Sequence, residues 1–356
     1  MKAVYTFLTN LWVKFYLKKN PIIKLPKPTK LENIQSIVIF SNTALGDTLM
    51  RTPAIVATRE AFPNAKIALF IAKNIYPLFK DYEFVDDFIL YDKGYKGFLK
   101  NIFQIRALKP DLILMYHSNG PQDIPTAILS GAKYILKTPR NGKHESLLST
   151  KLSRDMAAHF IPLSLKTLEY ITLKENSNIT MKLPSKYHDF IAKKALGGGL
   201  RIGFQMRTSK PQREWGVENF AKLAQEILGH FTNAEIFLSG TNQEKIYCEK
   251  IYSLLPSNLH NKVHNVCGKY KIDELPFFLK SLDCLITGDT GPMHLAGALK
   301  IPSVALFLGG ANPKTSGILQ DKEIHIEICQ EETIKPNQVL MELSNLLSHF
   351  TINTDF

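Results

Sequence analysis

The chain has 356 residues, of which 45% are hydrophobic and 21% charged, and its 44 Lys plus Arg against 32 Asp plus Glu give a net charge of +12. This composition excludes a largely disordered protein, because disorder requires low hydrophobicity together with high charge. No apolar run reaches the ~18 residues of a membrane span, and two domains are expected because a single core rarely exceeds ~250–300 residues. The four Cys form no CxxC pair, which argues against a zinc ribbon or a disulfide scaffold and fits a reducing compartment.

The first 31 residues hold seven Lys and no acid, so +7 of the net charge lies there. Apolar residues recur at helical spacing between residues 4 and 15, and prolines at 21, 26 and 28 end any helix. Polar interruptions argue against a secretory signal. Two interpretations stay open: a helix lying on an anionic membrane surface, or a helix that packs on the protein's own body and carries solvated lysines.

From residue 32 onward, short apolar strands alternate with helices. The patterns predict strands at 36–40, 66–71, 84–90 and 111–115, a helix from the loop 41–47 through residue 60, and a helix over 123–131. After a stretch rich in Asn, Pro and Gly between 172 and 200, they predict strands at 201–205, 235–239, 284–287 and 303–307 and helices over 217–228, 243–254, 273–282, 292–299 and 336–348. This alternation indicates two α/β units with parallel sheets, whose ligands sit beyond the carboxyl ends of the strands.

The loop 41–47 (Ser-Asn-Thr-Ala-Leu-Gly-Asp) follows the first strand and opens a helix. One interpretation makes Asp47 the N-cap of that helix, which stabilises by about 1 kcal/mol. The other places its carboxylate in the cleft between the domains, where it takes a proton from a substrate hydroxyl.

Two further turns contain residues suited to phosphate. The segment 287–294 (Thr-Gly-Asp-Thr-Gly-Pro-Met-His) predicts a strand end and a helix start, where backbone N–H groups can bind phosphate. Its single Asp-Thr-Gly does not fit an aspartic protease, which needs two such aspartates. The segment 206–215 carries Arg207, Lys210 and Arg213, which suit either a leaving diphosphate or a solvated basic loop. Trp215 is expected to be a packing anchor.

Several catalytic motifs are absent from the sequence. The segment 309–315 resembles a P-loop but has Pro313 where Gly must precede the Lys. There is no GxGxxG after the first strand, so an enzyme that transfers hydride with a dinucleotide loses support. No HExxH and no convincing Asp-x-Asp metal site appears.

Taken together, the loops resemble glycosyltransferase family 9, the ADP-heptose:lipopolysaccharide heptosyltransferases. The resemblance covers most of residues 34–315, and its motifs occur in family order: Ala-Leu-Gly-Asp-Thr at 44–48, Arg-Glu-Trp at 213–215, Cys-Gly at 267–268, Asp-Thr-Gly-Pro-Met-His-Leu-Ala at 289–296 and Gly-Gly at 309–310. It implies an α/β GT-B architecture, two Rossmann-like α/β domains facing each other across a cleft. The expected divisions are a basic amphipathic segment over 1–31, an acceptor-binding domain over 32–185, a nucleotide-sugar-binding domain over 186–335 and a C-terminal helix over 336–356 that packs back on the first domain.

The resemblance also implies roles for individual residues. Asp47 matches the general base. The positions matching the donor site are Thr208, Ser209, Arg213, Asp289, Thr290, Gly291 and His294. No metal and no cofactor is implied. The family usually has Lys where Arg213 stands and Pro where Gly216 stands, and Arg keeps the charge and can bind phosphate bidentately.

Acceptor phosphates have candidate partners in a basic stretch of the first domain, although a solvated basic face explains these residues nearly as well. The candidates are Arg140, Lys143 and His144, with Arg154 and His159 nearby.

The expected function is therefore inverting, metal-independent transfer of a heptose from an ADP-sugar to the phosphorylated lipid A-core of a lipopolysaccharide or lipooligosaccharide. The expected location is the cytoplasm, peripheral at the inner face of the bacterial inner membrane, with contact to anionic lipid through residues 1–31. Two alternatives stay open: another GT-B enzyme that uses a UDP-sugar, as a transferase or an epimerase, and a non-catalytic protein that binds nucleotide or nucleic acid. The concentration of charge beside an apolar stripe favours a membrane over nucleic acid, so no nucleic-acid partner is expected.

Overall fold

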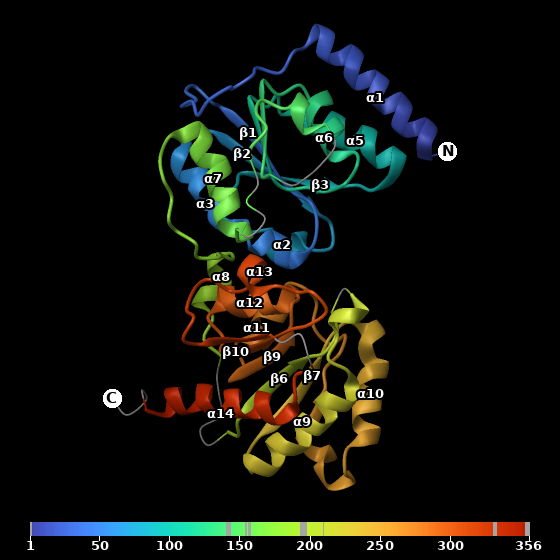
Figure 1. The fold of residues 1–356 in the computed structure, drawn as a ribbon, viewed down its shortest axis with the longest axis vertical. Helices are drawn as coiled ribbons and strands as arrows, with labels where there is room; N and C mark the ends of the chain where they lie inside the picture. The colour runs from blue at the N-terminus through green and yellow to red at the C-terminus, as the bar shows by residue number, and fades with distance from the viewer. Residues whose placement is uncertain are drawn as a thin grey trace. The chain divides into compact units, whose positions relative to one another are not determined.

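A computed structural model of the chain describes residues 2–139, 144–153, 155, 158–192, 198–208, 210–329 and 333–352. The chain divides into two compact units, Met1–Pro184 and Ser185–Phe356. Each unit is built around one parallel β-sheet with helices on its faces (Figure 1). The predicted fold class, two Rossmann-like α/β units, is confirmed.

The first unit contains a five-stranded sheet in the order β3-β2-β1-β4-β5. Its strands are β1 (Ser36–Ser41), β2 (Lys66–Ala72), β3 (Asp87–Tyr91), β4 (Leu112–His117) and β5 (Tyr134–Lys137). Its helices are α1 (Lys2–Lys19), α2 (Leu45–Leu49), α3 (Thr52–Ala61), α4 (Tyr76–Phe79), α5 (Gly94–Ala107), α6 (Asp123–Leu129) and α7 (Phe160–Thr172), with a 3₁₀ turn η1 (Glu145–Leu147). Chain order reverses between β1 and β4, and such a switch point opens a crevice at the carboxyl ends of the two strands.

The central strands of this sheet are buried on both faces. In β1, the four residues from Ile37 to Phe40 are fully buried, because helices cover both sides of the sheet. Phe40 packs against Phe70 of β2 with ring centroids 4.7 Å apart. This two-sided burial is the physical reason that the apolar runs in the sequence predicted these strands well.

The helix predicted to run from the first loop through residue 60 is wrong in one respect. It is broken into α2 and α3 at Met50 and Arg51. Pro53 has no N–H to donate to the carbonyl of Leu49, so a continuous helix would leave that acceptor empty. The hydroxyl of Thr52 donates to the Leu49 carbonyl instead, at 2.7 Å, and Pro53 occupies the first turn of α3.

The second unit contains a six-stranded sheet in the order β11-β10-β9-β6-β7-β8. Its strands are β6 (Arg201–Gln205), β7 (Glu235–Ser239), β8 (Val263–Asn265), β9 (Cys284–Gly288), β10 (Ser303–Phe307) and β11 (His325–Cys329). Its helices are α8 (Ser185–Asp189), α9 (Val217–His230), α10 (Lys245–Leu254), α11 (Leu275–Leu279), α12 (Gly291–Leu299), α13 (Pro313–Ser316) and α14 (Pro336–Ile352), with 3₁₀ turns η2 (Pro211–Arg213), η3 (Asn242–Glu244) and η4 (Ser257–Lys262). The switch point lies between β6 and β9.

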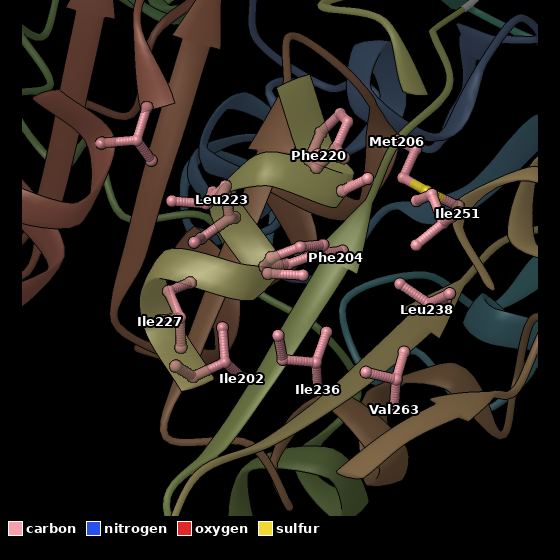
Figure 2. Close-up of a cluster of buried hydrophobic side chains, with 14 of the residues drawn as sticks. Ile202, Phe204, Met206, Phe220, Leu223, Ile227, Ile236, Leu238, Ile251 and Val263 are labelled. Atoms are coloured by element: carbon pink, nitrogen blue, oxygen red, sulfur yellow. The ribbon is translucent and has the colours of Figure 1, made fainter. Parts of the chain in front are cut away.

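The core of this unit forms where α9 covers β6 and β7. Phe204 of β6 packs against Phe220 of α9 with ring centroids 5.3 Å apart, and Ile236 of β7 lies beside them (Figure 2). Trp215 is the predicted anchor. It is buried, packs edge-on against Phe220 at 5.0 Å, and donates its indole N–H to the carbonyl of Ile334 at 2.7 Å.

The C-terminal helix requires a correction. It was expected to pack on the first domain, but its buried residues Val339, Leu343 and Leu346 belong to the core of the second unit, and α14 lies beside α9 (Figure 1). The residues recur at i, i+4 and i+7, so they form one helical stripe that the second unit buries.

Two of the four cysteines meet in the second unit. The sulfurs of Cys248 on α10 and Cys267 after β8 are 2.8 Å apart and buried as free thiols. Their separation of 19 residues gave no sign of this contact, because it depends on how α10 folds back over β8.

Candidate functional site

In the first unit, polar side chains gather where β1 and β4 end. These strands are parallel neighbours, with Ser41 paired to His117, so the loops that follow them start side by side. Asp47 comes from the loop after β1 as the third residue of α2. The N-cap of α2 is Ala44, which makes no side-chain cap bond. The interpretation of Asp47 as the N-cap is therefore wrong, and its carboxylate has other partners.

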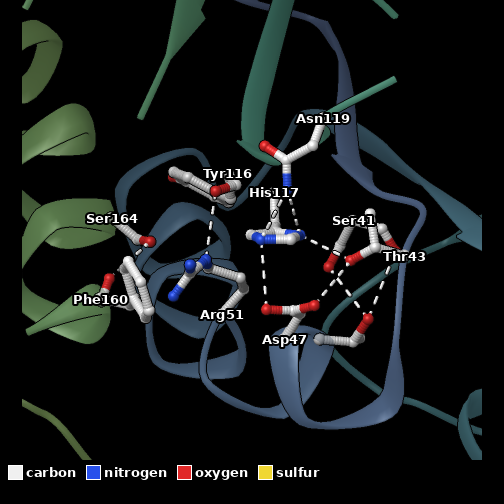
Figure 3. Close-up of polar contacts among 10 residues, drawn as sticks. Ser41, Thr43, Asp47, Arg51, Tyr116, His117, Asn119, Phe160 and Ser164 are labelled. Carbon is white, nitrogen blue, oxygen red and sulfur yellow. Dashed lines mark hydrogen bonds and ion pairs between the residues drawn. The ribbon is translucent and has the colours of Figure 1, made fainter. Parts of the chain in front are cut away.

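Those partners are a histidine and a threonine (Figure 3). Nε2 of His117 lies 3.2 Å from Oδ1 of Asp47, and the Thr43 hydroxyl donates to Oδ2 at 3.3 Å. The same hydroxyl lies 2.6 Å from Nδ1 of His117, and the side-chain nitrogen of Asn119 lies 2.9 Å from Nε2. His117 is 7% exposed, whereas the Asp47 side chain is 30% exposed. A buried imidazole thus orients a carboxylate that solvent can reach.

A second carboxylate, that of Asp123, ties the two loops together. It accepts a bond of 2.6 Å from the backbone N–H of Gly120 and one of 3.4 Å from the Asn42 amide. Asn42 itself donates its N–H to the carbonyl of His117. Asp123 is buried, and this burial raises the pKa of its carboxyl. Asp123 therefore stabilises the two loops, and Asp47 is the carboxylate that a substrate can approach.

Arg51 lies in the interior of the same unit. Its Nε donates to the carbonyl of Tyr116 at 3.1 Å, and its guanidinium lies 5.3 Å from the ring centroid of Phe160 at the start of α7 (Figure 3). Arg51 is 1% exposed. It therefore holds the end of β4, and with it His117, against α3 and α7.

In the second unit, charged residues gather where β6 and β9 end. These strands are neighbours, with Gln205 paired to Thr287. Nη1 of Arg213, in the turn after β6, lies 2.7 Å from Oδ2 of Asp289, which follows β9. The Arg213 side chain is 22% exposed and that of Asp289 10%. The structure thus brings together two predicted donor residues that are 76 positions apart.

Thr208 and Gly288 pack against each other beside this ion pair. A Cβ built on Gly288 would lie 2.8 Å from Cγ2 of Thr208 and 4.0 Å from the carbonyl oxygen of Arg213. The Thr208 hydroxyl bonds to the backbone of Lys210 in a tight turn. A side chain at 288 would force Thr208 to shift, so glycine favours this close approach of the loop after β6 to β9.

The start of α12 completes the group. Thr290 is the N-cap position and makes no side-chain cap bond, Gly291 is the first helical residue, and Pro292 fills the first turn. The Thr290 hydroxyl lies 3.1 Å from that of Thr287. An uncapped helix start favours an anion, and Arg213 balances the charge of Asp289 next to it.

The other predicted site residues lie apart from these two groups or outside the description. His294 is 3% exposed within α12. Arg207 donates to Glu214 at 2.6 Å and stacks over the ring of Tyr247, so it is held in a structural contact. Ser209, Arg140 and Lys143, together with Arg154, lie outside the described residues.

Of the predicted acceptor residues, His144 is described, with a left-handed backbone (φ of 72°) just before η1. His159 is buried and its Nδ1 accepts the N–H of Ile161 at the start of α7. It is an N-cap, so the expectation that it faces acceptor phosphates is corrected.

Sequence patterns did not predict four residues of this site: His117, Thr43, Asn119 and Arg51. Ending the fourth strand at residue 115 left His117 unplaced, although β4 continues to it. Polar residues at the carboxyl end of a buried strand next to a switch point are the signal that would have found His117 and Asn119.

Known proteins resemble this chain in both sequence and fold. The model of glycosyltransferase family 9 (heptosyltransferase) matches residues 153–342, more than half of the chain. Lipooligosaccharide heptosyltransferase 2 of Campylobacter jejuni is 26% identical over 341 residues, which cover 88% of this chain and 98% of that protein. Among solved structures, E. coli ADP-heptose lps heptosyltransferase II aligns with a TM-score of 0.73 at 19% identity, over 89% of this chain and all of the other. E. coli heptosyltransferase WaaC with ADP aligns with a TM-score of 0.69 at 13% identity, over 88% and 100%.

Proposed function

This chain belongs to glycosyltransferase family 9 (heptosyltransferase), and we propose that it transfers a heptose from an ADP-activated donor to a lipopolysaccharide or lipooligosaccharide core acceptor, with inversion at the anomeric carbon. The observation that carries the proposal is the Asp47 carboxylate, which is oriented by His117 and Thr43 and remains accessible. A general base needs these two properties.

In the proposed step, an acceptor hydroxyl attacks the anomeric carbon of the donor and its proton passes to Asp47. The bond between the anomeric carbon and the β-phosphate oxygen breaks, and ADP leaves with the electron pair. Attack on the face opposite the leaving group inverts the configuration. His117 is a positioning residue in this scheme: its contact with Oδ1 fixes the carboxylate.

We assign the donor to the second unit. Negative charge builds on the diphosphate as it leaves, and preorganised cations and N–H groups that meet such charge give large rate effects. Arg213, Thr208 and the start of α12 supply these groups, and the proposal assigns the charge to them rather than to a metal ion. Ser209 and His294 keep their proposed donor roles, and Arg140, Lys143 and His144 their proposed roles toward acceptor phosphates.

The acceptor proposed here is lipid-linked, and we place the enzyme at the inner face of the bacterial inner membrane. Within the described residues, no helix has the length and apolar character needed to cross a bilayer. In α1, however, Phe7 (67% exposed), Leu11 and Phe15 recur every four residues on a side turned away from the buried Val13. By helical geometry Lys18 projects from that same side, and Lys14 and Lys19 lie at its two margins, a pattern typical of helices on anionic membranes.

In a direct test, the purified protein is incubated with ADP-heptose or UDP-sugars and truncated lipid A-core acceptors, and the product is followed by mass spectrometry. The proposal expects an acceptor mass increased by one heptose, with release of ADP. EDTA should leave the rate unchanged. Turnover with a UDP-sugar alone would favour the alternative GT-B function, and absence of any turnover in a folded protein that binds ADP would favour the non-catalytic one.

A further inference from the structure

A groove in the first unit lies between the N-terminal helix α1 and helix α6, and of its lining residues only His144 has a role in the reaction proposed above. Its volume is about 410 Å³, within the ~300–1,000 Å³ of small-ligand sites. Its floor and walls are apolar, formed by Val13, Leu17, Ile124, Pro125, Ile128 and Leu147. Hydrocarbon is the chemistry that such a surface accepts.

Helix α1 is fixed on the body of the unit, so the groove is a stable feature of the fold. Tyr5 and Trp12 both pack edge-on against Phe98 of α5, with ring centroids 5.9 and 6.2 Å away. Val13 belongs to the core of the unit. After the helix, the N–H of Ile23 bonds to the carbonyl of Lys133 at 3.0 Å, which anchors the segment that leads into β1.

The rim of the groove is cationic. Lys14 and Lys18 stand one helical turn apart at its margin, with His144 also lining it. No carboxylate in the described part of the chain forms an ion pair with either lysine, and Lys18 contacts the ring of Phe15. Two like charges at i and i+4 repel each other, so an anion between them would be stabilising. The complementary ligand has an anionic head and a hydrocarbon tail.

We propose that this groove binds one acyl chain of an anionic glycerophospholipid, with the lipid phosphate against Lys14 and Lys18. At about 100° per residue, Lys14 and Lys18 project from the same side of α1 as the exposed Phe7 and Leu11, so a lipid can enter the groove directly from a bilayer. The proposal rests on the membrane contact proposed above and deepens it: α1 holds the protein by one face, touches lipid with the other, and grips a single lipid at the boundary.

The chain offers its own probe and matched control. Trp12 is on α1, and the only other tryptophan, Trp215, is buried in the second unit and gives a constant background. The ligand is lysophosphatidylglycerol brominated in its acyl chain, used below its critical micelle concentration, and the readout is quenching of Trp12. Lys18→Glu and Lys19→Glu make the same charge change at adjacent positions, and only Lys18 lines the groove.

We expect saturable quenching with one lipid per chain, an affinity lowered about tenfold or more by Lys18→Glu, and little change with Lys19→Glu. Leu17→Gln, in the groove, should weaken binding more than Leu11→Gln on the outer face. Equal effects of Lys18→Glu and Lys19→Glu, or absence of saturable quenching, would each overturn the proposal.

A second measurement separates this site from the membrane contact itself. Phe7→Ser with Phe15→Ser should abolish flotation of the protein with phosphatidylglycerol vesicles yet leave binding of the monomeric lipid intact. Flotation that persists in the wild type without monomer binding would overturn the groove and spare the membrane contact. Binding of the monomeric lipid without flotation of the wild type would overturn the membrane contact and leave the groove proposal intact. Neither result depends on turnover.

Discussion

Asp47→Asn is the sharpest test of the proposed base. The amide keeps the size of the carboxylate and retains one oxygen that can accept from Thr43 or His117, so the local contacts of α2 should persist. What it loses is the ability to accept a proton from the acceptor hydroxyl. We therefore expect a loss in kcat, with the KM for donor and acceptor changed little.

The expected size follows from the surroundings of Asp47. General bases contribute about 10²–10⁴-fold to turnover, which corresponds to about 3–5 kcal/mol of transition-state free energy. No nearby carboxylate in the described residues is placed to substitute, because that of Asp123 is buried and held by the N–H of Gly120. The loss should therefore lie in the upper part of this range.

The assay measures ADP release at varied acceptor concentration, with product confirmed by mass. Asp87→Asn is the matched control: it removes the same charge from β3, the edge strand of the same sheet, and should not change turnover. His117→Gln should cause a smaller loss, because it disturbs the orientation of the base and keeps the base itself. If Asp47→Asn retains kcat within about threefold of wild type with an unchanged melting temperature, the base is another group and the assignment fails.

The remaining predictions concern the donor site and stability. Arg213→Ala should weaken ADP binding by about tenfold or more, because it removes a cation and leaves the Asp289 charge facing the diphosphate; calorimetry with Lys210→Ala as control tests this, and an unchanged Kd removes Arg213 from the site. Burial lowers the pKa of His325 from 6.5 to about 4, so between these values the unfolded chain takes up a proton that the folded chain excludes, and stability falls as pH falls. Urea unfolding should show a loss of about 2 kcal/mol between pH 7 and pH 5 that His325→Gln abolishes; the same slope in both proteins would refute it. Leu343→Ala should destabilise by about 2–5 kcal/mol, against little change for the exposed Met341→Ala on the same helix.

The sequence was most informative about strands buried on both faces. The runs at 36–40 and 303–307 are apolar after their first serine, and each became a central or near-central strand. Patterns of this kind report burial directly. Strands near the edges carry weaker signals: β5, β8 and β11 were not predicted.

Local sequence patterns did not predict which elements pack against each other. The apolar stripe of α14 indicated that one face is buried, and nothing in it said that α9 would bury it. The sequence suggested that α1 either packs on the body of the protein or faces lipid, and these were treated as alternatives. In the structure Val13 is buried, whereas Phe7 and Phe15 of the same helix are exposed. Packing on the body and contact with lipid are therefore compatible.

For the site too, individual residues were predicted and their contacts were not. The resemblance supplied Asp47, Arg213 and Asp289, but not the contact between the last two, which depends on β6 and β9 being neighbours. His117 was missed because its significance is its place beside β1, and that place exists only after the sheet has formed.

The place of α14 also bears on the order in which the protein folds during synthesis. The first unit is complete in one stretch of chain that ends at Pro184, so all its contacts are available while the ribosome is still making the second unit. The second core lacks Val339, Leu343 and Leu346 until those residues emerge. Until then the side of α9 that packs against α14 is uncovered, and a nascent chain paused before residue 336 would expose it to chaperones and to aggregation.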